Sequence, residues 1–152
     1  MTATFTDFVA YQDACNTIQL NVTKWTLMLC DALKQNYIDY SIKSHNRCLE
    51  RGESIDYNNA RIADLRNGEC DYEFIIESGR KYHKIIMVID NGLDRSPSRS
   101  VHAFVDKKTG EVYKSASWKS PAKGVRYDLR IIEQREWLLE NADWASAYLY
   151  AR

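Results

Sequence analysis

An apolar seam near the N-terminus constrains the fold of this chain more than any other feature. Apolar residues recur there at alternating steps of three and four, at Phe8, Tyr11, Cys15, Ile18, Val22, Trp25, Leu29 and Ala32. This period places them on one face of an α-helix, which we predict from about Phe5 to about Tyr40. Thr4, followed three residues later by Asp7, supplies an N-cap and a first-turn acid.

The seam has two interpretations. A helix packed on its own sheet produces such a stripe, and so does a coiled-coil homodimer, because the seam spans about four heptads. Further apolar residues widen the stripe beyond two positions per heptad: Phe5, Val9, Leu27, Met28 and Leu33. This width favours packing within the chain. Asn and β-branched residues weaken the helix and allow a break near Asn21.

After the long helix, the pattern predicts a shorter helix at residues 56–66, closed by Asn67-Gly68 as a C-terminal cap signal. Strands are predicted at residues 72–76, 84–89, 101–105 and 111–117, with a loop at 91–100. Residues 106–110 form a hairpin turn in which Gly110 takes the left-handed conformation. Residues 129–141 are amphipathic and helical, and residues 147–151 fit an added edge strand.

These elements compose an α+β fold in one domain, residues 1–152. The helical part, residues 4–68, packs on a small antiparallel sheet of about four strands at residues 70–118, and a basic loop and C-terminal helix follow at 119–152. With 152 residues, of which 45% are hydrophobic, the chain can bury a core of its own.

Cysteine usage and hydropathy point to the interior of a cell. Cys15, Cys30, Cys48 and Cys70 include no Cys-x-x-Cys pair and have no histidine at ligand spacing, which favours buried free thiols over a zinc site. The longest apolar run, residues 85–89, is too short to cross a bilayer. The first residues lack the pattern of a secretory signal. We expect no cofactor and no membrane contact.

Charge is balanced overall, with 21 Lys/Arg and 21 Asp/Glu, but it is unevenly distributed. Between Gly79 and Arg130 there are twelve Lys/Arg and five Asp/Glu. If these segments also separate in space, one surface faces a polyanion and another is acidic.

Aromatic residues alternate with bases in the same region. Aromatic rings stack on nucleobases while Lys and Arg neutralise phosphates. We therefore predict a nucleic-acid site made of Lys107, Lys108, Tyr113, Lys114, Trp118, Lys119, Lys123 and Arg126. The competing interpretation is structural, because ordinary strands bury their aromatic residues and place lysines at sheet edges.

Catalytic motifs do not stand out. His45, His83 and His102 are isolated, and the sequence contains no nucleophile elbow and no glycine-rich phosphate loop. Asp90, followed by Asp106-Lys107-Lys108, resembles the Asp…Asp-x-Lys arrangement of metal-dependent nucleases. Residues 106–110 fit a turn better, because Asp readily accepts local backbone hydrogen bonds. We expect a non-enzymatic binding protein, with His102 as a hydrogen-bonded structural residue.

Two segments carry a resemblance to a known family. Residues 104–127, FVDKKTGEVYKSASWKSPAKGVRY, and residues 142–150, ADWASAYLY, resemble small uncharacterised proteins of tailed bacteriophages, cyanophages especially. The hairpin followed by A-S-W-K-x-P-A-K-G-x-R is its most specific part and singles out Trp118, Pro121, Lys123, Gly124 and Arg126.

The resemblance implies a phage origin and a place in the host cytoplasm, and it implies no mechanism. Small phage proteins of this kind bind nucleic acid, bind and redirect a host protein, or join the virion. We expect the first of these functions, with the other two as alternatives.

Overall fold

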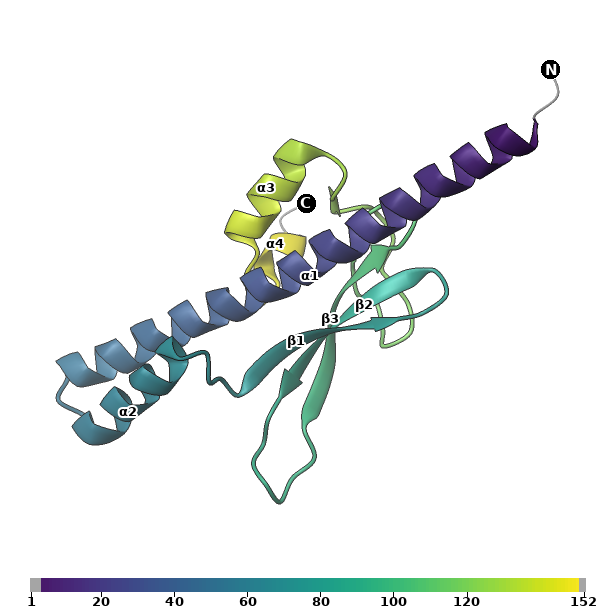
Figure 1. The fold of residues 1–152 in the computed structure, drawn as a ribbon. Coiled ribbons are helices and arrows are strands. Elements are labelled where there is room, and N and C mark those ends of the chain that lie inside the picture. The colour runs from purple at the N-terminus through teal and green to yellow at the C-terminus, as the bar shows by residue number, and fades with distance from the viewer. Residues whose placement is uncertain (1–3, 151–152) are drawn as a thin grey trace.

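The computed structural model describes residues 4–150 and has an α+β architecture (Figure 1). Its elements are α1 (Phe5–Glu50), α2 (Ile55–Arg66), β1 (Tyr72–Ser78), β2 (Tyr82–Ile89), β3 (Ser98–Asp106), β4 (Glu111–Lys114), β5 (Tyr127–Asp128), α3 (Ile132–Asn141) and α4 (Ala147–Tyr150). The strands form one antiparallel sheet in the order β1-β2-β3-β4-β5. The predicted α+β class is confirmed, although the sheet has five strands instead of about four.

Helix α1 begins as predicted and is longer than predicted. Thr4 Oγ1 accepts a hydrogen bond from Asp7 N, and the Asp7 carboxylate accepts one from Thr4 N, both at 3.1 Å. The predicted break near Asn21 does not occur: the helix is continuous there, and the nearby residues Val22 and Thr26 are fully buried. It ends at Glu50, well past Tyr40.

The extension of α1 is explained by α2, which folds back along its C-terminal part (Figure 1). Ile38 of α1 is buried, as are Ile62 and Leu65 of α2. Gly68 has a φ of 81°, so the predicted cap signal after α2 is confirmed. The C-terminal part of α1 is mostly polar, and it stays helical because α2 packs against it.

The core lies between α1 and one face of the sheet, with α3 beside α1 (Figure 1). Val22, Leu29 and Leu33 of α1 are completely buried, as is Ile85 of β2. Each such side chain contributes about 1.5–3 kcal/mol of burial free energy. From Val22 onward, the seam of α1 therefore packs within the chain, as predicted. Of the residues taken to widen the stripe, however, only Leu33 is buried, whereas Phe5, Val9, Leu27 and Met28 are exposed.

Several strand boundaries differ from the predicted ones. Strand β3 starts at Ser98, inside the predicted loop, and β4 ends at Lys114 instead of residue 117. The short strand β5 was not predicted. Backbone pairing with a neighbouring strand decides these limits, and two residues carry too little periodicity to reveal a strand.

The C-terminal segment is helical where an edge strand was predicted. The Asp143 carboxylate accepts hydrogen bonds from the backbone amides of Ala147 and Tyr148, both at 3.2 Å, and so favours a helical turn. Tyr148 and Leu149 are consecutive and both buried. A strand would point them to opposite faces, whereas the helix α4 buries both.

A β-bulge places a buried polar pair at the centre of the fold. The pairing of β2 with β3 shifts register between Ile85 and Ile86, which leaves His102 on the same side as its neighbour Ala103. His102 Nε2 lies 2.7 Å from the Tyr148 hydroxyl, which confirms His102 as a hydrogen-bonded structural residue. Burial lowers the pKa of His102 to about 4, and the nearby Asp143 charge only partly opposes this.

Candidate nucleic-acid interface

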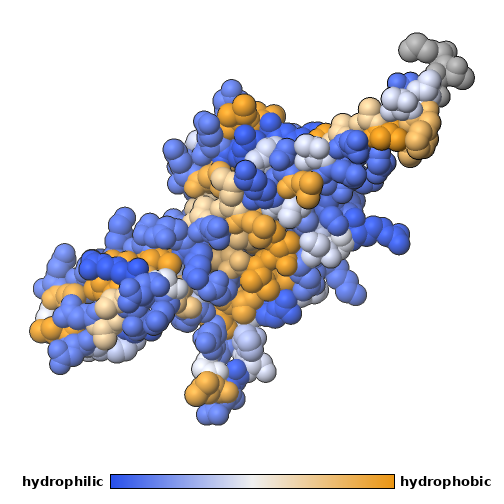
Figure 2. All heavy atoms as spheres, viewed as in Figure 1, coloured by the Kyte–Doolittle hydropathy of each residue, from blue (hydrophilic) through white to orange (hydrophobic). Residues whose placement is uncertain are grey.

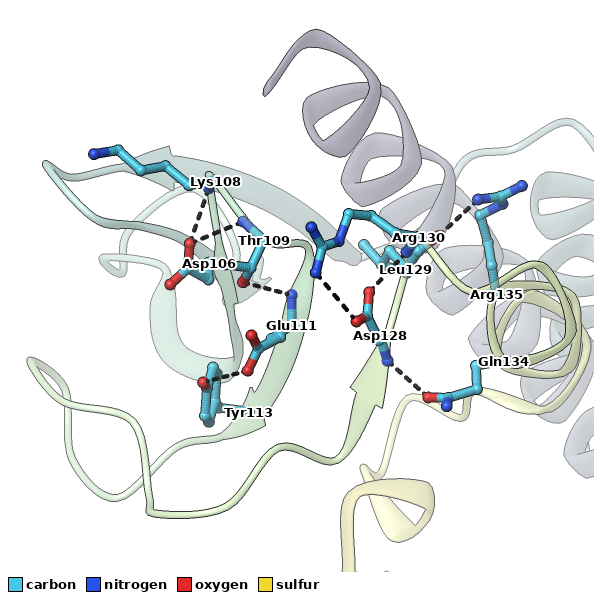
Figure 3. A network of polar contacts seen from close by, with 10 residues as sticks. All are labelled: Asp106, Lys108, Thr109, Glu111, Tyr113, Asp128, Leu129, Arg130, Gln134 and Arg135. Carbon is cyan, nitrogen blue, oxygen red and sulfur yellow. Dashed lines mark hydrogen bonds and ion pairs between the residues drawn. The ribbon is translucent and has the colours of Figure 1, made fainter. Parts of the chain in front are cut away.

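The hairpin between β3 and β4 is built by its own turn chemistry (Figure 3). Asp106 Oδ1 accepts hydrogen bonds from Lys108 N at 2.9 Å and Thr109 N at 3.1 Å. Gly110 has a φ of 75°, as predicted, and a Cβ there would lie 3.4 Å from Val22 Cγ2. The turn therefore packs against α1. The hydrogen bonds within the turn occupy the Asp106 carboxylate.

This geometry separates the two acids of the nuclease-like pattern. Asp106 pairs with Tyr82 at the start of β2, whereas Asp90 follows the other end of that strand. The Asp90 carboxylate accepts a hydrogen bond from Gly92 N at 2.9 Å. Within residues 4–150, the structure contains no group of three or more His, Cys, Asp or Glu side chains able to hold a metal ion.

Aromatic rings and a lysine line the sheet surface that faces away from α1. Strand alternation decides this placement, because His83 bonds to Thr23 of α1 and Val105 and Val112 enter the core. The side chains on the other surface, which we call the outer face, include Tyr82, Lys84, Phe104, Tyr113 and, from the loop after β4, Trp118. The rings of Phe104 and Tyr113 meet that of Tyr82 edge-on, at 5.7 Å and 6.0 Å between centroids.

Trp118 is the most accessible ring of the outer face. It follows β4 and is 42% exposed. Lys84 Nζ lies 4.5 Å from its ring centroid, and the guanidinium carbon of Arg99 lies 5.8 Å from it. Arg99 also forms an ion pair with Glu77 at 3.1 Å. These cation–π contacts hold the indole and two positive charges together.

A pocket of about 260 Å³ adjoins this ring at the β1–β2 turn. Its lining includes four cationic side chains, Arg80, Lys81, Lys84 and Lys119, and we call it the basic pocket. One carboxylate, Glu77, also lines it. Like charges held around a concave surface raise the local potential for anions.

A family model matches residues 5–151, which includes α1, the whole sheet and the basic pocket. The chain belongs to this family of unknown function, DUF7717. No curated protein and no solved structure matches the chain significantly.

In this DUF7717 chain, part of the predicted site comes together. Tyr113 and Trp118 lie on the outer face, and Lys119 lines the basic pocket. Lys107 adjoins the pocket, because its Nζ donates to the carbonyl of Gly79 at 3.1 Å.

Other predicted residues lie elsewhere on the fold. Lys108 lines a hollow beside Tyr11 and Cys15 of α1. Lys114 lies on the helix side of the sheet, with its Nζ 4.4 Å from the ring centroid of Tyr150. Lys123 is exposed in the loop before β5, and Arg126 N donates to the carbonyl of Val112 at 2.7 Å.

The part of the phage-like segment that follows β4 folds back along this strand. Ala122 N donates to the carbonyl of Lys114 at 2.7 Å, and the Ser120 carbonyl accepts from the amides of Ala116 and Ser117. Gly124 has a φ of 97°, which disfavours any side chain there. The segment is thus a tight backbone structure that presents Trp118 and Lys119 at its tip.

Sequence reasoning missed the contribution of β2 and its turn to the candidate site. Arg80, Lys81 and Lys84 precede the segment on which the prediction rested. Strand alternation in YHKIIMVI does place Tyr82 and Lys84 on one face. The pairing of Lys84 with Phe104 depends on strand register, which the sequence does not report.

The surroundings also shift the pKa values of two titratable groups at this site. Burial, a hydrogen bond to Glu111 and the charge of that residue raise the pKa of Tyr113 to about 12 (Figure 3). Burial, followed by the charge of Lys107, lowers the pKa of His83. Tyr113 therefore stays protonated and neutral at physiological pH, and the positive potential of this region comes from Lys and Arg.

Proposed function

We propose that this protein binds nucleic acid through the basic pocket and the adjoining ring of Trp118. The observation that carries the proposal is the convergence of Arg80, Lys81, Lys84 and Lys119 on one pocket. Cationic side chains neutralise phosphates and release counterions, which supplies most of the sequence-independent affinity for nucleic acid.

Lys84 connects the two parts of this site, because it lines the pocket and lies over the indole of Trp118. A phosphate in the pocket brings the attached nucleoside close to the exposed ring. Stacking on that ring requires an unpaired base, so we expect a preference for single strands.

The resemblance to tailed-phage proteins supports a wider proposal: an accessory protein of phage origin that acts in the host cytoplasm without catalysing a reaction. None of the helices in the described part of the chain is long and apolar enough to cross a membrane. Binding of a host protein and incorporation into virions remain the alternatives if nucleic acid does not bind.

The test is fluorescence anisotropy with labelled single- and double-stranded DNA and RNA, at low and then physiological salt. The site variant carries Arg80→Ala, Lys84→Ala and Lys119→Ala. The control variant removes the same charge from the helical part, through the exposed residues Lys24→Ala, Lys43→Ala and Arg66→Ala.

We expect the site variant to bind more weakly and to lower the slope of log affinity against log salt by about 2 for a single strand. The control variant should retain affinity. Equal losses in both variants would mean that net charge, and no particular site, is responsible. Absence of binding at low salt would reject the proposal and direct attention to host proteins recovered by affinity purification and to purified virions.

A further inference from the structure

The N-terminal part of α1 projects beyond the sheet with an apolar surface uncovered (Figures 1 and 2). Phe5 is 81% exposed, Phe8 58% and Tyr11 69%. The heptad steps that bury Val22 and Leu29 continue backwards through these residues. We call Phe5, Phe8, Tyr11, Cys15 and Ile18 the projecting seam. The largest contiguous apolar patch on a monomeric protein, typically about 300–600 Å², is often a functional surface.

We propose that the projecting seam binds the same seam of a second copy of this chain, with the two helices antiparallel. Steps of three and four are the spacing of coiled-coil contacts. The rings of Phe5, Phe8 and Tyr11 together expose roughly 400 Å² per copy, from about 200 Å² for a whole aromatic side chain. This is about half of the ~800 Å² that each partner buries in a standard interface, and flanking polar residues add to it.

The sheet decides the orientation of the pair. From Val22 onward, the same stripe of α1 is covered by the sheet of its own chain. A parallel partner would continue along that stripe and collide with the sheet. An antiparallel partner overlaps only the projecting part of the helix. In such a pair each of the two heptad positions packs against the other, which pairs Phe8 with Ile18 and Tyr11 with Cys15.

Charge complementarity supports the same arrangement. Residues 5–23 contain two acids, Asp7 and Asp13, and no Lys or Arg. At the base of the projecting seam, Lys108 lines a hollow of about 350 Å³ together with Tyr11, Cys15 and Ile18. An antiparallel partner brings its first helical turn, and therefore Asp7, to this hollow. A parallel partner would place Asp7 next to Asp7.

The test is the mass of the full chain by multi-angle light scattering, from about 1 to about 100 μM, which covers the affinity expected of a small interface. We expect the mass to rise from one chain of 17.7 kDa to two. Phe8→Glu should hold it at one chain. The control Leu20→Glu, on the opposite side of the helix and 72% exposed, should still dimerise.

Circular dichroism separates dimer loss from misfolding, because Phe8 makes no contribution to the buried core and Glu is a good helix former. A single-chain mass for the unmodified protein at every concentration overturns the proposal. So does a dimer that Phe8→Glu leaves intact. No nucleic acid is present, so this test is independent of the proposed function.

Oxidative cross-linking tests the orientation, in a background of Cys48→Ser and Cys70→Ser. In the antiparallel pair, Tyr11→Cys faces Cys15 of the other copy, and this variant should form a covalent dimer while the background protein does not. A covalent dimer of the background protein through Cys15 would show a parallel pair and overturn the antiparallel arrangement.

Discussion

Lys84 Nζ lies 4.5 Å from the centroid of the Trp118 ring, although the two residues are far apart in sequence. The pairing of Lys84 with Phe104 in β3 and the return of the chain after β4 bring them together. The contact makes one side chain part of both the basic pocket and the aromatic surface. Substituting Lys84 or Trp118 one at a time therefore separates the contribution of charge to binding from that of base stacking.

Trp118→Ala should lower the affinity for single-stranded nucleic acid about tenfold, because base–aromatic stacking contributes about 1–3 kcal/mol. It should leave the salt slope unchanged. Lys84→Ala should weaken binding and reduce that slope by about 0.7, the value for one phosphate on a single strand. Anisotropy titrations at several salt concentrations measure both quantities. Unchanged affinity in Trp118→Ala would mean that the indole has only a structural role.

Acid should destabilise the protein through His102. Its pKa falls from 6.5 to about 4 on folding, so the unfolded chain takes up the proton first as pH drops. The free energy of unfolding should be highest above pH 6.5 and decrease towards pH 4, by roughly 3 kcal/mol for this group. Urea denaturation across this range measures the change.

His102→Gln provides the control for that pH dependence. Glutamine does not titrate, and its amide can still form a hydrogen bond with the Tyr148 hydroxyl. The slope between pH 6.5 and 4 should flatten in this variant, although His83, whose pKa is also lowered, retains a part of it. An unchanged slope would assign the effect to other groups.

Gly110→Ala should destabilise the fold by more than 1 kcal/mol. Its φ of 75° strains any other residue, and the added methyl would meet Val22, Leu129 and Arg130 at 3.4–3.5 Å. Gly68→Ala is a matched control, with a φ of 81° and no atom within 4 Å of the new methyl. Thermal unfolding should show the larger loss for Gly110→Ala. Equal losses would mean that backbone strain alone matters at both turns.

Trp144→Ala should cost about 2 kcal/mol, which is less than the 3–5 kcal/mol typical of a fully buried ring. Trp144 meets the stacked pair Tyr37 and Tyr72 edge-on, at 5.4 Å and 5.7 Å between centroids. Trp118→Ala, which removes an exposed ring, should cost much less. Chemical denaturation compares the two, and similar losses would contradict the role of Trp144 in joining α1 to β1.

Structural features that depend on residues close together in the sequence were predictable from it. The Thr4–Asp7 cap, the helical seam, the Asp106–Gly110 turn and the cap signal at Gly68 all depend on contacts or conformations a few residues apart. Their chemistry is local, so reading the chain in order is enough to locate them. The α+β class follows from these elements together.

Tertiary structure decided which of these residues meet. Strand register and the fold-back of the chain after β4 place Lys84 with Trp118 and Lys119, whereas Lys108 and Lys114 lie on the helix side. The limited reach of the sheet leaves Phe8 exposed while it covers Val22 on the same seam. The periodicity of apolar residues shows which side chains share one face of a helix or strand, but it does not show what packs against that face. Strand register and the burial of a helix face depend on contacts between segments that are far apart in the chain.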